Sequence, residues 1–210
     1  MKKTIFVILL VAMGLSVMSQ NIQLIGGMSS DKSFVNWATF ELYKSLEKGA
    51  MYYFTDFKID QNGYFEAYTE ISKYWNIGDI GAVTAQFNAG LNKDFQILPV
   101  YLAGVSKLWE IGGEFILSVD LLYRYQQELI LDDEWDHGYQ VTVIYLRDWD
   151  KFQISGYCDF WNNKYVVFEP QAWWKAFDRV WFGAELRLSN YTLLENYTNY
   201  AMAGIKWNLE

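Results

Sequence analysis

The feature that most constrains this chain is a two-residue alternation of apolar and polar side chains, which recurs from about residue 22 to its end. Residues 114–126 show it clearly, because every second position from 115 to 125 is apolar or aromatic. The intervening positions include Glu114, Asp120 and Arg124. Successive side chains of a strand point to opposite faces, so this period predicts strands rather than helices.

Twelve runs of this kind can be counted, each about ten residues long, which is the length that a tilted strand needs to cross a bilayer. The connections between them average about five residues. No change in composition divides the chain, so residues 20–210 are expected to form one all-β domain. The runs lie at residues 22–29, 37–45, 51–60, 64–74, 82–92, 97–108, 114–127, 139–147, 152–162, 165–175, 180–190 and 199–209.

The connections differ in kind along the chain. Five are short and turn-like, at residues 45–49, 76–81, 110–113, 148–151 and 177–179. The longest candidate loop runs over residues 128–138. If the strands alternate up and down, the five short turns meet at one end and the long loop lies at the other, as in transmembrane β-barrels.

The first 19 residues resemble an export signal. Lys2 and Lys3 precede an apolar run from Ile5 to Ala12, and small side chains lie near Ser19. This layout predicts a secretory signal peptide, residues 1–19, that is cleaved before Gln20. A single membrane anchor is the alternative, although the run is shorter than the roughly 20 residues of a spanning helix.

Alternation alone does not say which face points outward. A soluble sandwich would bury the apolar face, whereas a membrane barrel turns it toward lipid and encloses the polar face. Export, the even number of strands, their asymmetric connections and aromatic residues near many strand ends favour the barrel. We therefore expect a 12-stranded antiparallel transmembrane β-barrel, with a soluble exported β-protein as the alternative.

In such a barrel the polar faces line the lumen. They carry more acids than bases, which favours a wet lumen, because uncompensated carboxylates are costly in a dry one. A salt-bridged network that only braces the barrel is the alternative. The predicted pore-lining residues are Glu41, Asp56, Lys58, Glu66, Tyr68, Glu70, Glu114, Asp120, Arg124, Tyr157, Asp159, Trp161, Glu169, Trp181, Glu185, Arg187 and Lys206.

Composition excludes several other classes. One cysteine cannot form an internal disulfide, and one histidine with one cysteine cannot supply a zinc ligand set. The formal net charge of −8 argues against binding nucleic acid. We expect no metal and no cofactor. Cys158 falls on the face assigned to lipid and is expected to be a small apolar filler.

The segment from 123 to 161 resembles a known family. Tyr123-Arg124-Tyr125-Gln126, the acidic step Glu134-Trp135-Asp136, Gly138-Tyr139 and Ser155-Gly156-Tyr157 are similar to the nucleoside-specific, channel-forming (Tsx-type) outer-membrane porins. The chain is shorter than typical members and fits a shorter branch. The resemblance implies a monomeric 12-stranded barrel and passive uptake of nucleosides.

The prediction is therefore a passive channel for small hydrophilic solutes in the outer membrane of a Gram-negative bacterium. Its partners would be lipid, the solute and the barrel-assembly machinery. A non-conducting structural barrel is one alternative. A surface hydrolase is another, with His137 as a base beside the other charged residues assigned to the extracellular loop, Asp132, Asp133, Glu134 and Asp136. The same carboxylates could instead bind calcium.

Overall fold

The computed structural model describes residues 19–30, 32–61, 63, 65–92, 96–127, 135–190 and 199–209. The predicted signal peptide, apart from Ser19, lies outside them. Within these ranges no helix is both long and apolar enough to cross a membrane. The strands are β1 (Ser19–Ser29), β2 (Phe34–Leu46), β3 (Gly49–Asp60), β4 (Phe65–Ile77), β5 (Gly81–Asn92), β6 (Gln96–Ile111), β7 (Phe115–Gln127), β8 (Trp135–Asp148), β9 (Phe152–Trp161), β10 (Tyr165–Lys175), β11 (Val180–Ser189) and β12 (Tyr200–Asn208).

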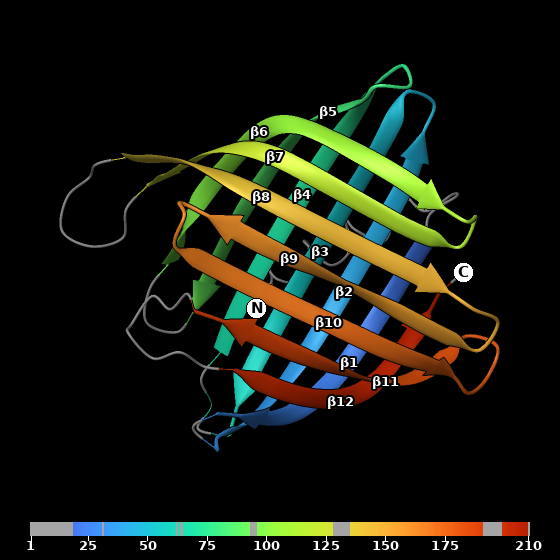
Figure 1. Ribbon diagram of the computed structural model, residues 1–210. Helices are drawn as coiled ribbons and strands as arrows, with labels where there is room; N and C mark the ends of the chain where they lie inside the picture. The colour runs from blue at the N-terminus through green and yellow to red at the C-terminus, as the bar shows by residue number, and fades with distance from the viewer. Residues whose placement is uncertain are drawn as a thin grey trace, which may run out of the picture.

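Each strand pairs antiparallel with its neighbours in the chain, and β1 pairs with β12 to close the barrel (Figure 1). At the closure Ile25 lies opposite Gly204, and Gln23 lies opposite Lys206. A closed sheet leaves no strand edge unpaired, and a hydrocarbon environment requires this because it offers backbone groups no water. The predicted fold class is confirmed.

The ends of the barrel differ. The five short turns, at residues 47–48, 78–80, 112–114, 149–151 and 176–179, join even-numbered strands to the strand that follows each. They gather at the end where the C-terminus lies (Figure 1). Gly112 and Gly113 both have positive φ, 65° and 78°, which side chains with a Cβ rarely adopt. The connections at the other end range from three residues, between β9 and β10, to ten, between β11 and β12.

Strand β8 begins earlier than the alternation predicted. It starts at Trp135, which pairs with Gln127, and the ladder continues through His137 opposite Tyr125. Asp136 and His137 are therefore strand residues, and placing them in the loop was wrong. Their charge suggested a loop, but the pairing with β7 extends past it. Asp132, Asp133 and Glu134 lie outside the described residues.

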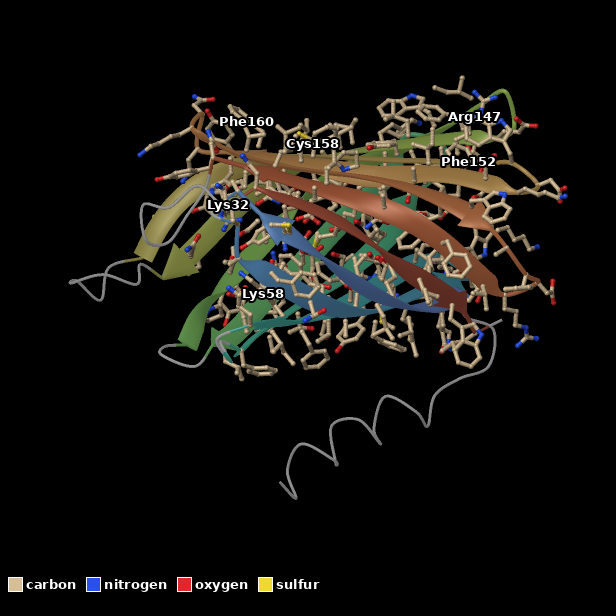
Figure 2. All side chains as sticks on the ribbon, turned by 90° about the horizontal axis from the view of Figure 1, so that it is seen from below. Lys32, Lys58, Arg147, Phe152, Cys158 and Phe160 are labelled. Carbon is tan, nitrogen blue, oxygen red and sulfur yellow. The ribbon has the colours of Figure 1, made fainter. Side chains whose placement is uncertain are left out.

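Side chains are distributed as in an inside-out protein. Figure 2 shows carbon-rich side chains projecting from the outer surface, while many oxygen and nitrogen atoms lie between the walls. The labelled Phe152, Cys158 and Phe160 point outward, as the alternation predicted for Cys158. Not all aromatic residues near strand ends lie on the outer wall, because several point into the lumen: Tyr52, Tyr74, Trp161, Trp173, Trp181 and Tyr200.

Candidate functional site in the barrel lumen

Six of the carboxylates that point into the lumen come from six different strands. They are Asp56 on β3, Glu70 on β4, Asp120 on β7, Asp159 on β9, Glu169 on β10 and Glu185 on β11. Glu70 interacts electrostatically with Asp159, although β4 and β9 lie on nearly opposite sides of the barrel. Asp56 likewise interacts with Glu169. The carboxylates therefore form one group that spans the lumen, which we call the acidic ring.

Neighbouring hydroxyls and amides hold these carboxylates in place. Asp120 accepts hydrogen bonds from Ser106 Oγ at 2.5 Å and from Tyr74 Oη at 3.0 Å. The second bond crosses from β4 to β7, so it ties two parts of the wall that are not neighbours. Thr142 donates to Asp159 at 2.5 Å, and Thr39 donates to Asp56 at 2.6 Å. Hydrogen bonds of this kind stabilise an ionised carboxylate.

Four basic side chains share the lumen with the acidic ring: Lys58, Arg124, Arg187 and Lys206. Arg187 pairs with Glu169, its cross-strand neighbour, whose side chain is only 7% exposed. Arg124 donates to Gln140 at 2.6 Å and lies 5.2 Å from the ring of Trp161. Lys58 donates a hydrogen bond to Tyr200 Oη at 2.9 Å. Figure 2 shows Lys58 between the walls of the barrel. All four bases contact an aromatic face, a favourable electrostatic arrangement.

One part of the lumenal wall is apolar, which the alternation did not predict. A buried cluster runs across β10, β11, β12, β1 and β2. Within this cluster Trp173 is completely buried and lies over Gly183, where a Cβ would come within 2.3 Å of the indole. Glycines on adjacent strands, Gly183 and Gly204, are the sequence signal that could have identified it. The cluster comprises Ile25, Val35, Trp37, Trp173, Trp181 and Met202.

The structure separates one predicted pore residue from the rest. Glu114 lies in the turn between β6 and β7, with its side chain 60% exposed, and forms an ion pair with Arg147 at 3.4 Å. The prediction that it lines the lumen was wrong, because β7 begins only at Phe115 and the alternation does not extend into the turn. The other predicted lumenal side chains point inward: Glu41, Asp56, Lys58, Glu66, Tyr68, Glu70, Asp120, Arg124, Tyr157, Asp159, Trp161, Glu169, Trp181, Glu185, Arg187 and Lys206.

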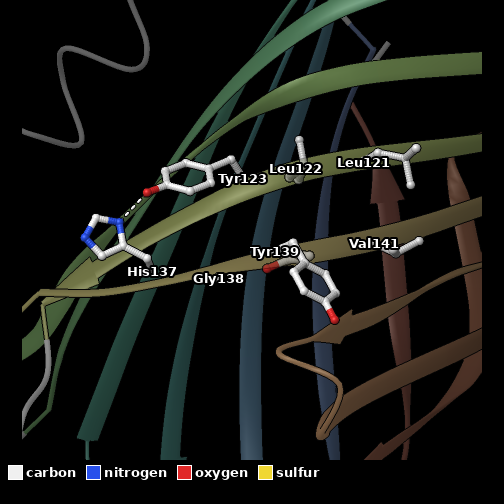
Figure 3. A pocket seen from close by; sticks show the side chains of 8 residues that line it. Leu121, Leu122, Tyr123, His137, Gly138, Tyr139 and Val141 are labelled. Atoms are coloured by element: carbon white, nitrogen blue, oxygen red, sulfur yellow. Dashed lines mark hydrogen bonds between the residues drawn. The ribbon is translucent and has the colours of Figure 1, made fainter.

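His137 lies on the outer wall, beside a shallow groove of about 530 Å³ between β7 and β8 (Figure 3). Its Nδ1 is hydrogen-bonded to the hydroxyl of Tyr123, whose side chain is also on the outer wall. The described residues that line the groove include no serine or cysteine. The hydroxyl that His137 contacts is therefore that of a tyrosine, Tyr123.

Comparisons with known proteins agree with the fold. Residues 21–209 match the family model described as "Domain of unknown function (DUF5020)". No curated protein sequence matches the chain. The NanC porin is similar in structure, with a TM-score of 0.62 and 11% identity, over 90% of this chain and 100% of the porin.

Two further solved structures have the same architecture. The KdgM porin in complex with disordered oligogalacturonate gives a TM-score of 0.58 and 9% identity, over 90% of this chain and 99% of that one. The COG4313 outer membrane channel from Pseudomonas putida F1 gives 0.53 and 6% identity, over 93% and 97%. At these identities the likeness shows the fold alone, which is that of 12-stranded outer-membrane porins.

Proposed function

This chain belongs to the family described as a domain of unknown function (DUF5020), and we propose that it is a passive channel for small hydrophilic solutes. The observation that carries the proposal is the acidic ring. Carboxylates from six strands face one another across the inside of a barrel whose outer wall is apolar and aromatic. Charges are expensive to enclose in a dry interior, so this arrangement favours a lumen that contains water and admits ions.

The cellular location follows from the same arrangement, in which an apolar outer wall surrounds a polar lumen. We place the barrel in the outer membrane of a Gram-negative bacterium, with residues 1–19 as a cleaved signal peptide and lipid around the outer wall. Insertion would use the barrel-assembly machinery. Closure of the sheet within one chain supports a monomer, because no strand edge is left for a second copy to complete.

The charge of the lumen bears on the solute. The KdgM structure contains oligogalacturonate, an acidic oligosaccharide. The lumen described above has more acids than bases, so we expect this channel to prefer cations and neutral solutes over acidic ones. The resemblance of residues 123–161 to Tsx-type channels makes nucleosides the first solutes to test.

Single-channel recording of the refolded mature chain tests the proposal. We expect stepwise conductance, with a reversal potential in a KCl gradient that indicates cation preference. Neutralising Glu70 and Asp159 together, as Glu70→Gln and Asp159→Asn, should reduce that preference. Glu114→Gln is the matched control, because Glu114 lies at the turn and should leave ion selectivity unchanged. Anion preference in the wild type would contradict the lumenal assignment.

A structural, non-conducting barrel is the second candidate, and cross-lumen hydrogen bonds favour it. Tyr74 reaches Asp120 from β4 to β7, and Lys206 reaches Gln153 from β12 to β9. If these contacts close the lumen, refolded protein would show no conductance at any voltage. Restoration of conductance by Tyr74→Phe would then identify a plugged channel rather than a purely structural barrel.

A further inference from the structure

Two buried polar atoms in the lumen have neither a hydrogen-bond partner nor an ion-pair partner within the described part of the chain. They are Oε1 of Gln23, whose residue is 1% exposed, and the indole N–H of Trp181, which is 7% exposed. An acceptor or donor buried without a partner costs roughly 1–3 kcal/mol, so proteins rarely keep one without a reason. Two of them on neighbouring parts of the lumenal face point to a ligand.

The fold brings these two atoms to one place. Gln23 on β1 lies directly opposite Lys206 on β12, and Lys206 lies directly opposite Trp181 on β11. The three side chains therefore occupy one row across three adjacent strands, with backbones about 10 Å apart from first to last. All three residues lie near the barrel end that carries the short turns.

The ammonium of Lys206 completes the row. It hydrogen-bonds to Gln153 Oε1 across the lumen, and it lies 4.7 Å from the ring of Trp173 and 5.4 Å from the ring of Trp181. These contacts turn the ammonium toward β9, β10 and β11, on the Trp181 side of the row. A ligand that displaces the side chains covering Gln23 and Trp181 would meet a carbonyl oxygen, an ammonium and an indole N–H.

We propose that Gln23, Lys206 and Trp181 form a subsite for a neutral, hydroxyl-rich solute, such as a sugar or the ribose of a nucleoside. A hydroxyl both donates and accepts, so one can donate to Gln23 while another accepts from Trp181. A carboxylate would accept from Lys206 and Trp181 but would face the lone pairs of the Gln23 carbonyl. The subsite rests on the proposed function and narrows its solute class.

Solute-induced current noise in single-channel recordings tests the subsite, with D-ribose as the probe. Trp181→Phe removes the N–H and keeps an aromatic ring, and Gln23→Leu removes the acceptor at similar size. Each should weaken ribose block about three- to tenfold, the effect of losing one hydrogen bond. Trp207→Phe is the matched control, because it makes the same change on the outer wall of β12 and should leave the block unchanged.

Two further measurements keep the outcomes distinct. Tetraglyme has ether oxygens and no hydroxyl, so it cannot donate to Gln23, and it should obstruct the wild type and the Gln23→Leu variant equally. If Gln23→Leu fails to assemble, Gln23→Glu serves instead, since it keeps an acceptor and should retain ribose block. Equal ribose block in the wild type and Trp181→Phe would overturn the subsite. A wild type without conductance would overturn the channel itself.

Discussion

At the scale of single residues, the lumen is defined by side chains that meet across it. Tyr74 and Asp120 are 46 positions apart in sequence, and two strands separate β4 from β7. Asp120 is 1% exposed and accepts hydrogen bonds from hydroxyls on three residues. Buried carboxylates with several donors are sensitive to the loss of any one of them, because the remaining charge is then less well satisfied.

Tyr74→Phe should therefore lower the free energy of unfolding by about 1.5–3 kcal/mol, the range for a hydrogen bond to a charged group. Urea unfolding in lipid vesicles measures it. A double-mutant cycle with Asp120→Asn separates this bond from the general effect of each substitution. Additive effects in the cycle would show that the two side chains do not interact.

Gly183 gives a second prediction at this scale, because its missing side chain makes room for Trp173. A Cβ there would lie 2.3 Å from the indole and 2.4 Å from the carbonyl oxygen of Ala172. Gly183→Ala should destabilise the barrel by about 1–3 kcal/mol, as overpacking does. The control is Ala203→Val on the outer wall, where the added methyl groups meet lipid.

At the scale of elements, β10 contains a proline inside a closed sheet. Pro170 has no N–H to donate, and the β10–β11 pairing is interrupted between Phe168 opposite Leu188 and Gln171 opposite Glu185. The ion pair of Glu169 with Arg187 lies in this interval and joins the same two strands through side chains. The pair thus links the strands where the backbone ladder is weakest.

Glu169→Gln should cost about 3 kcal/mol of stability, since it leaves Arg187 without its buried counter-charge. Glu114→Gln removes an exposed ion pair with Arg147 and should cost under about 1 kcal/mol. Unfolding midpoints of the two variants, measured side by side in vesicles, make the comparison. Similar losses in both would show that Glu169 and Arg187 contribute no more than a surface pair.

At the scale of the whole molecule, the inversion of polarity makes a distinct prediction about the single cysteine. Cys158 points outward (Figure 2). Asp159, its neighbour on β9, lies opposite Thr142 and points inward. A charged, water-soluble thiol reagent should not modify Cys158 in vesicles, because hydrocarbon excludes the reagent and disfavours the thiolate. The reagent should modify the variant that combines Cys158→Ser with Asp159→Cys, whose thiol faces the lumen.

Mass spectrometry after a timed exposure to the reagent measures the modified fraction of the wild type and of the variant. Denaturation in detergent before labelling is the control, and it should make both thiols equally reactive. Rapid modification of native Cys158 by the charged reagent would mean that the apolar face meets water. The barrel would then not be a membrane protein.

Much of this architecture follows from local pattern. Strand number, the positions of the short turns and the outward face of residues such as Cys158 depend on alternation within about ten residues, and sequence is sufficient for that. The two wrong assignments concern residues at strand ends, where the alternation no longer indicates the position of a side chain. Glu114 was assigned to the lumen although it belongs to a turn, and His137 was assigned to a loop although pairing with β7 extends the strand.

The sequence by itself determined that twelve strands each have one apolar face, since side-chain alternation is a property of a single strand. Only the tertiary structure decided which lumenal groups meet. Tyr74 with Asp120, Lys206 with Gln153, and Trp173 over Gly183 depend on the register between strands and on the closure of β1 with β12. Register is set cooperatively by the whole ladder, so no local stretch of residues specifies these contacts.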